Sequence, residues 1–130
     1  MILDSSVVVA VLRQEPEASR FTRAIELGQP CRISAGNYVE ASIIIDRSGD
    51  ARVSRRLDEF FRTSRTIVEP VTAKQAQIAR QAYGDFGKGR HKAGLNFGDC
   101  FAYALAKDLD EPLLFKGTDF EHTDVEVAEY

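Results

Sequence analysis

Residues 95–107 read LNFGDCFAYALAK, and this stretch is the most informative in the chain. Residues 101–106 are apolar or aromatic without interruption, which predicts a helix buried in a core. The exception is Asp99, a carboxylate in the first turn of that helix. An acid at this position can cap free backbone N–H groups and interacts favourably with the helix dipole. A second role follows only if other carboxylates reach the same place.

The composition is that of an ordinary globular protein of 130 residues, with 44% hydrophobic and 28% charged side chains. This length suits one domain, which we expect to span residues 1–130. No apolar run is long enough to cross a bilayer, so no membrane partner is expected. The apolar start contains Asp4 and lacks the basic segment of a secretory signal. Cys31 and Cys100 fit no metal-binding spacing and are expected to be free, buried thiols of a cytoplasmic protein.

Short apolar segments alternate with helical segments along the chain. Strands are expected at residues 1–3, 31–34, 66–71 and 112–115, with residues 123–127 as a further edge strand. The hydrophobic spacing between them predicts helices. Thr72 and Gln75 have the sequence pattern of a capping box. The alternation predicts an α/β fold: a three-layer domain whose short, mainly parallel sheet is flanked by helices.

Four carboxylates are expected to meet at one edge of this sheet. Asp4 follows the first strand, Asp119 follows the last, and Asp99 begins a helix. Ligands of open parallel sheets bind at the carboxyl ends of the strands, and right-handed crossovers bring helix N-termini to that edge. Glu40 lies within side-chain reach of it. As the lone acid of an apolar helix, Glu40 is costly unless it is paired or coordinated.

Carboxylates gathered in this way would repel one another unless a divalent cation lay among them. Oxygen ligands alone suit Mg²⁺ or Mn²⁺. Such an ion activates a water molecule and stabilises a leaving oxygen. The predicted chemistry is therefore hydrolysis of a phosphodiester.

Four segments resemble, in order, the PIN-domain ribonucleases of the VapC toxin family: MILDSS, NYVEAS, GLNFGDCFAYALAK, and PLLFKGTDF with the following HTD. The resemblance covers nearly the whole chain. It implies the PIN fold and a Mg²⁺-dependent endoribonuclease that is the toxin of a type II toxin–antitoxin module. It also implies an RNA substrate, a homodimer, and a cognate VapB-like antitoxin that occupies the active-site groove.

The resemblance assigns roles to particular acids. Asp4 matches the first family acid, Glu40 the second, and Asp99 the acid of the G-D-C motif. Asp4 and Asp99 are the expected direct metal ligands. The fourth position stays open between Asp119, in the G-x-D-F position, and Asp124, which follows in HTD. We expect Asp4, Glu40, Asp99 and the fourth acid to be catalytic.

Basic side chains are bunched although the net charge is −3. Lys88, Arg90 and Lys92 lie in the segment GKGRHKAG, just before the Asp99 helix, and either contact RNA phosphates or are only solvated. With three glycines and little to bury, this segment is expected to be mobile. The arginines of residues 52–65 are expected to form a solvated helix face.

Two other sets of polar side chains have competing interpretations. Ser5 or Ser6 either caps the following helix or contacts a metal-bound water or the scissile phosphate. Cys100 with His91 or His122 would suggest thiol catalysis, but nothing in the sequence orients such a pair.

Two other functions compete with the nuclease. An acyl-phosphate hydrolase also begins with an Asp after a strand, but that chemistry needs a second acid two residues later, where this chain has Ser6. The other alternative is a catalytically degenerate PIN module that only binds RNA or a protein partner. The presence of Asp4, Glu40 and Asp99 argues against that loss.

Overall fold

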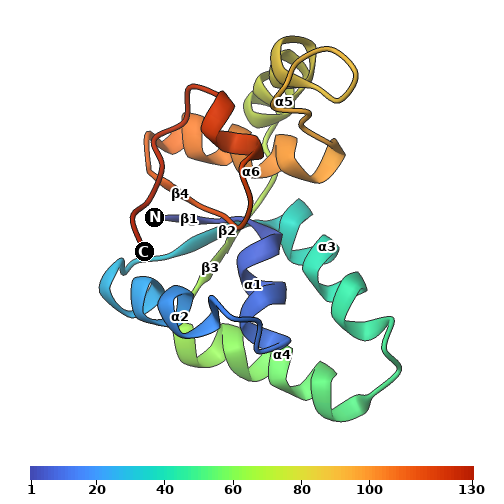
Figure 1. The fold of residues 1–130 in the computed structure, drawn as a ribbon, viewed down its shortest axis with the longest axis vertical. Coiled ribbons are helices and arrows are strands. Elements are labelled where there is room, and N and C mark those ends of the chain that lie inside the picture. The colour runs from blue at the N-terminus through green and yellow to red at the C-terminus, as the bar shows by residue number, and fades with distance from the viewer.

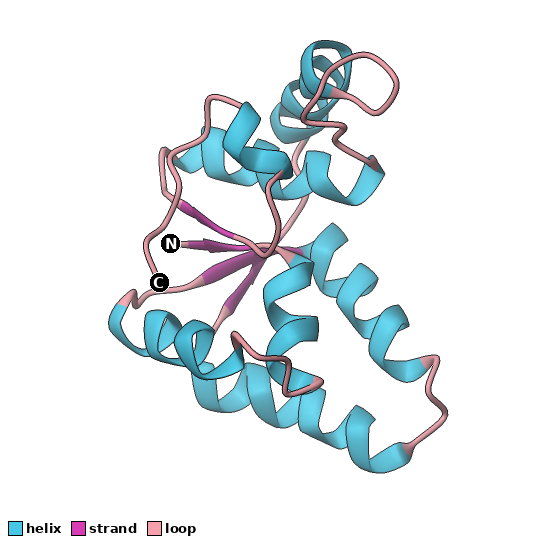
Figure 2. Cartoon of the chain, in the orientation of Figure 1, coloured by secondary structure: helices cyan, strands magenta, loops and turns pink.

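The computed structural model describes residues 1–130. Its centre is a sheet of four parallel strands in the order β3-β2-β1-β4. The strands are β1 (Ile2–Leu3), β2 (Arg32–Ser34), β3 (Ile67–Glu69) and β4 (Leu113–Leu114). They fan out from a common point between the two helical layers (Figure 2). The predicted α/β class, with a short parallel sheet between helices, is confirmed.

Six α-helices and one 3₁₀ helix surround the sheet: α1 (Ser5–Leu12), α2 (Ala18–Leu27), α3 (Ala35–Asp46), α4 (Ala51–Ser64), α5 (Ala73–Phe86), α6 (Phe97–Leu109) and η1 (Asp119–His122). Helices α5, α6 and η1 lie on one side of the sheet, and α1, α2 and α4 lie on the other (Figure 1). None of the helices combines the length and hydrophobicity needed to span a membrane.

Alternating side chains along very short strands build a hydrophobic core on each face of the sheet. Ile2 and Leu113 pack into the cluster formed by α5, α6 and the C-terminal segment. The next residues, Leu3 and Leu114, pack into the cluster formed by α1, α2, α3 and α4. All four side chains are fully buried. Because successive strand residues point to opposite faces, strands of two residues suffice to supply both cores.

The strand order places a topological switch point between β1 and β4. From β1 the chain moves through β2 to β3, and α5 and α6 then carry it back to β4 on the other side of β1. A crevice opens at the carboxyl ends of the strands where an α/β sheet reverses its order in this way. Asp4 follows β1 at that point, and its backbone N–H donates to the carbonyl of Leu114 at 2.9 Å.

The segment GKGRHKAG has more to bury than its glycines suggest, while its mobility stays a prediction. Ala93 and the following Leu95 are buried. The N–H of Lys88 donates to the carbonyl of Leu95, and the N–H of Leu95 donates to that of Phe86, both at 2.9 Å. The segment is therefore closed at its base, while the side chains of Lys88, Arg90 and Lys92 remain exposed.

Two smaller expectations were wrong in detail. Residues 123–127 form only an isolated bridge, between Val127 and Leu113, because β4 offers two residues for pairing. Thr72 caps α5 by accepting from the N–H of Gln75 at 3.1 Å, but the Gln75 side chain does not complete the capping box. It donates instead to Asp108 at 3.0 Å.

The close packing of α3 on α6 predicts opposite effects for two glycine substitutions. A Cβ atom at Gly36 would lie 2.8 Å from the Phe101 ring, whereas one at Gly84 would meet nothing within 4 Å. Gly36→Ala should lower the free energy of unfolding by about 1–3 kcal/mol through overpacking. Gly84→Ala, within α5, should raise it by about 0.5–1 kcal/mol through helix propensity. Urea unfolding of both variants tests this, and equal effects would contradict the packing argument.

Candidate active site

Asp4 has one carboxylate oxygen that accepts a hydrogen bond and one that has no hydrogen-bond partner. It is the N-cap of α1, where its Oδ2 accepts from the N–H of Ser6 at 2.9 Å. The interpretation that Ser5 or Ser6 caps this helix was wrong, because Asp4 holds the position. The side chain is 4% exposed, and its Oδ1 is buried without any hydrogen-bond partner. A buried unpartnered carboxylate oxygen is costly in a protein and is suited to a cation.

Asp99 is also bonded through one oxygen. Its Oδ2 accepts from the N–H of Asn96 at 2.8 Å, and its own N–H donates to Asn96 Oδ1 at 2.9 Å. These reciprocal bonds form a capping box at the start of α6. The predicted capping role is confirmed, but the partner was missed, although Asn three residues before an acid was a visible signal. Oδ1 has no bond in this box.

Glu40 is held by two neutral donors. Its Oε2 accepts from Ser5 Oγ at 2.6 Å and from Asn37 Nδ2 at 3.2 Å. Its other oxygen, Oε1, lies against the backbone of α6, where a Cβ atom at Gly98 would be 2.2 Å away. A glycine before Asp99 therefore lets Glu40 approach the helix closely. The expectation that this lone acid needs a partner is confirmed, although neither Asn37 nor Ser5 had been assigned to it.

The carboxylates of the site influence one another's ionisation. The pKa of Asp99 is raised to about 7. Burial is the largest cause, and the negative charges of Asp4, Asp119 and Glu40 add to it, whereas the hydrogen bond from the N–H of Asn96 lowers the pKa. Burial likewise raises the pKa of Asp4. Its hydrogen bonds to Ser6 lower this pKa, and the negative charge of Glu40 raises it. Raised carboxyl pKa values in a shared crevice are typical of functional sites.

Asp119 and Asp124 differ in their surroundings. Asp119 begins η1, beyond β4, and its charge acts on Asp99. Asp124 accepts a hydrogen bond from the Tyr103 hydroxyl at 2.6 Å and pairs with Lys107 Nζ at 3.1 Å. These two contacts lower the pKa of Asp124. The structure thus brings Asp119 close enough to act electrostatically on Asp99 and gives Asp124 partners of its own.

The donor set fits a hydrated divalent cation. No three acidic, histidine or cysteine side chains stand close enough together to hold an ion among them. Charge interactions extend further than coordination bonds, so this spacing agrees with the coupled pKa values. Mg²⁺ usually keeps several waters and binds to proteins through one or two carboxylates. The unpartnered Oδ1 of Asp4 and the Oδ1 of Asp99, which the capping box leaves unbonded, would suit this kind of coordination.

The site does not support thiol catalysis. Cys31 and Cys100 are free and buried, as predicted. Burial, followed by the charge of Asp99, raises the pKa of Cys100 to about 11, which disfavours the nucleophilic thiolate. His91 is engaged elsewhere, since its Nδ1 accepts from the N–H of Ala93 at 3.1 Å.

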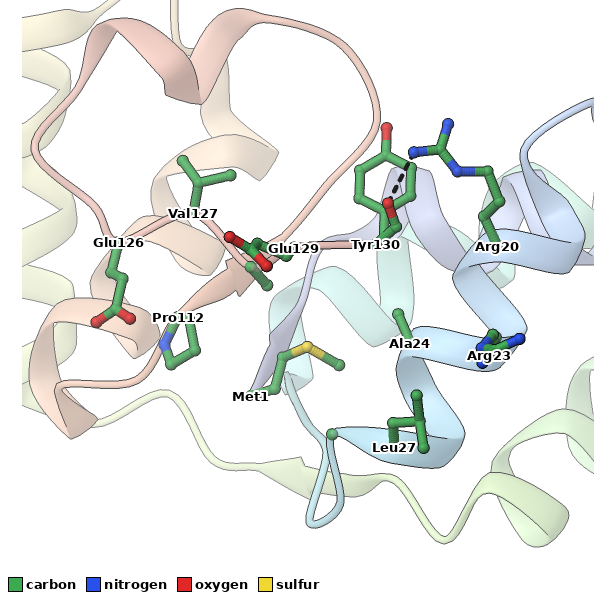
Figure 3. A pocket seen from close by; sticks show the side chains of 12 residues that line it. Met1, Arg20, Arg23, Ala24, Leu27, Pro112, Glu126, Val127, Glu129 and Tyr130 are labelled. Atoms are coloured by element: carbon green, nitrogen blue, oxygen red, sulfur yellow. Dashed lines mark hydrogen bonds between the residues drawn. The ribbon is translucent and has the colours of Figure 1, made fainter.

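Another hollow, of about 610 Å³, lies at the opposite edge of the sheet between Met1, α2 and the C-terminal tail (Figure 3). Arg20 donates to the carbonyl of Tyr130 at 2.7 Å, and the Tyr130 ring packs on Phe21 with centroids 4.4 Å apart. Its charged lining is mixed, with Arg20 and Arg23 on one side and Glu126 and Glu129 on the other. It lies at the amino ends of the strands, away from the edge where parallel sheets bind ligands.

A model of the PIN domain family matches residues 1–126. The chain belongs to the PIN-domain family. Within it, this PIN domain falls among the VapC proteins: it is 50% identical to Ribonuclease VapC28 of Mycobacterium tuberculosis over 129 residues, which cover 98% of this chain and 97% of that protein. It is 45% identical to Ribonuclease VapC30 of the same species over 125 residues, covering 96% and 95%. The resemblance drawn from the motifs is confirmed.

Solved structures agree on the fold. The crystal structure of Mycobacterium tuberculosis VapC20, described as a sarcin-ricin loop cleaving toxin, superposes with a TM-score of 0.74 at 16% identity and 95% coverage of both chains. A toxin–antitoxin complex from Klebsiella pneumoniae gives a TM-score of 0.74 at 15% identity, covering 99% of this PIN domain and 97% of that chain.

The raised pKa of Asp99 predicts a pH-dependent stability for this PIN domain in EDTA. Between the ordinary carboxyl value of 3.8 and about 7, the folded state binds more protons than the unfolded state. The contribution of Asp99 to stability must therefore fall as pH rises through this window. Asp99→Asn should unfold at a similar free energy to wild type at pH 4, and be more stable by about 1–2 kcal/mol at pH 8, after discounting for solvent screening.

Urea unfolding at the two pH values measures this difference. Asp58→Asn is the matched control, because Asp58 is an exposed acid on α4. An Asp99→Asn variant with the same pH dependence as wild type would contradict the assignment.

Proposed function

We propose that this PIN domain is the toxin of a type II toxin–antitoxin module and that it hydrolyses RNA phosphodiester bonds with Mg²⁺, or with Mn²⁺ in its place. The observation that carries the proposal is that the carboxylates of Asp4, Glu40 and Asp99 are hydrogen-bonded in the same way. In each, hydrogen bonds hold one carboxylate oxygen and leave the other available. The names of the relatives, which are ribonucleases, give it independent support.

Each acid has a proposed role. Asp4 and Asp99 would hold the ion through their unbonded Oδ1 atoms. Glu40 and Asp119 would accept hydrogen bonds from the attacking water and so orient it. When bound, a divalent ion supplies a more acidic water and neutralises charge on the phosphodiester. We favour Asp119 over Asp124 as the fourth acid because Tyr103 and Lys107 already occupy Asp124.

The proposed partners are an RNA substrate, a VapB-like antitoxin and a second copy of the chain. The toxin–antitoxin complex among the structural neighbours supports the antitoxin. For the homodimer, the support is an apolar surface beside Glu40: Val39, Ile43 and Phe97 are 53%, 54% and 79% exposed. All three side chains line a hollow of about 330 Å³. Exposed apolar patches of this kind mark interaction surfaces. We expect these partners to meet in the cytoplasm.

A catalytically degenerate PIN module that only binds RNA or a protein remains the second candidate. It would keep the fold and the basic segment but would not need carboxylates in a costly, mutually repulsive arrangement. Cleavage of RNA with Mg²⁺, compared with EDTA, separates the two functions directly.

Asp99→Asn is the test of the metal-dependent nuclease. The amide keeps the shape of the carboxylate and can still accept the bond from Asn96, so the variant should fold. It removes one metal ligand and should lower cleavage of total RNA at least about 100-fold, the scale expected when a catalytic ion is lost. Mg²⁺ should raise the melting temperature of wild type but not of the variant. Asp58→Asn should cleave normally; wild-type cleavage by Asp99→Asn would refute the proposal.

A second test concerns the basic segment. Joint replacement of Lys88, Arg90 and Lys92 by alanine should weaken RNA binding and make the plot of log affinity against log salt less steep, since fewer counterions are released. The melting shift with Mg²⁺ should be unchanged. Replacement of Arg52, Arg55 and Arg56 on the exposed face of α4 is a control of equal charge. If both triple variants keep the wild-type salt slope, the segment does not contact RNA.

A further inference from the structure

Asn37 is a buried amide to which the proposed reaction assigns no role. It lies on α3 and is 0% exposed. Its Nδ2 donates to the carbonyl of Gly98 at 2.9 Å and to Glu40 Oε2 at 3.2 Å. Both partners are acceptors, so the NH₂ group must face them, and the orientation of the amide is fixed by its surroundings. Burial of an amide is costly, which calls for a reason for its presence here.

The bond to Gly98 is more than helix capping requires. Gly98 lies inside α6, where backbone carbonyls accept bonds from the next turn of the helix. The start of α6 already has its cap in the reciprocal bonds of Asn96 and Asp99. Asn37 therefore adds a link between two helices that are complete without it.

This link joins the three elements that carry the acids. Gly98 precedes Asp99 on α6, and Glu40 is one turn beyond Asn37 on α3. The same oxygen of Glu40 accepts from Ser5 Oγ at 2.6 Å, and Ser5 follows Asp4. The network is made only of neutral donors. A lysine or arginine in their place would also hold Glu40, but its positive charge would compete with a metal ion for the site.

We propose that Asn37 is a positioning residue which, together with Ser5, fixes Glu40 against the start of α6 and so holds the acids in place before a metal binds. This inference rests on the proposed nuclease function. Repulsion among the acids would otherwise turn Glu40 toward solvent. The two neutral donors hold Oε2, leave Oε1 without a hydrogen bond, and keep the carboxylate against Gly98.

The test uses Asn37→Leu, a replacement of similar size without donors, and Asn37→Ser, which is smaller and keeps a hydroxyl. Gln75→Leu is the matched control: Gln75 is also a buried amide that donates to an acid, Asp108, on the other helical layer. We expect the Asn37 variants to lower the cleavage rate and to raise the Mg²⁺ concentration needed for half-maximal cleavage, by about 10- to 100-fold in combination. Gln75→Leu should alter stability alone.

The melting shift produced by Mn²⁺ without RNA gives a readout that does not depend on activity. It should be smaller in Asn37→Leu and in Ser5→Ala than in wild type at the same ion concentration. Ser5→Ala removes the other donor to Glu40 and serves if Asn37→Leu does not fold. Wild-type cleavage, Mg²⁺ dependence and Mn²⁺ shift in Asn37→Ser and Ser5→Ala would overturn the inference.

A double-mutant cycle separates positioning from stability. In a Glu40→Ala background, Asn37→Leu should cause little further loss of cleavage, because the residue through which it acts is gone. An undiminished loss would show that Asn37 acts through the fold and would overturn the inference. Asp99→Asn distinguishes this failure from failure of the function itself. If Asp99→Asn abolishes cleavage while the Asn37 variants cleave normally, the nuclease stands and only the positioning role falls.

Discussion

Mutual repulsion of carboxylates at the carboxyl end of the sheet is the constraint around which this structure is arranged. Asp4, Glu40 and Asp99 come from three separate elements, and burial leaves the charges of Asp4 and Asp99 poorly solvated. The protein does not neutralise them with cations. It bonds one oxygen of each to a backbone N–H or a neutral side chain and leaves the other oxygen available. Bringing like charges together in this way costs stability, and a divalent ion, as proposed above, would relieve that cost.

The acids elsewhere in the chain are treated differently. Glu111 pairs with Arg32, Asp108 with Lys74, and Asp124 with Lys107. Of the ion pairs in the structure, none involves Asp4, Glu40, Asp99 or Asp119. This separation agrees with the proposed metal site, because a lysine or arginine there would occupy the space and neutralise the charge that a metal ion would need. Asp124, with its tyrosine and lysine partners, falls on the structural side of this division.

The fold brings the acids together through close approach of helices. Gly36 lets α3 pack directly on the Phe101 ring of α6, and Gly98 lets the Glu40 carboxylate lie against the α6 backbone. Two cores, one on each face of a sheet with strands of two or three residues, hold the helices at these distances. Rigid packing on both faces makes it possible for a few hydrogen bonds to fix the acids. The geometry of the site therefore depends on these two glycines, because a side chain at either position would displace an acid or its helix.

The sequence by itself determined the alternation of strands and helices, the parallel α/β class and the acids at the ends of these elements. Hydrophobic periodicity and helix capping depend only on residues that are close together in the chain. The sequence also carried the family motifs around Asp4, Glu40 and Asp99. Only the tertiary structure decided the strand order, the separate bonding of Asp124 and the network of Ser5 and Asn37. Ser5 and Glu40 are 35 residues apart, and Asn37 and Gly98 are 61 apart. Hydrogen bonds across such separations depend on how distant helices pack, which no local pattern of hydrophobicity or charge encodes.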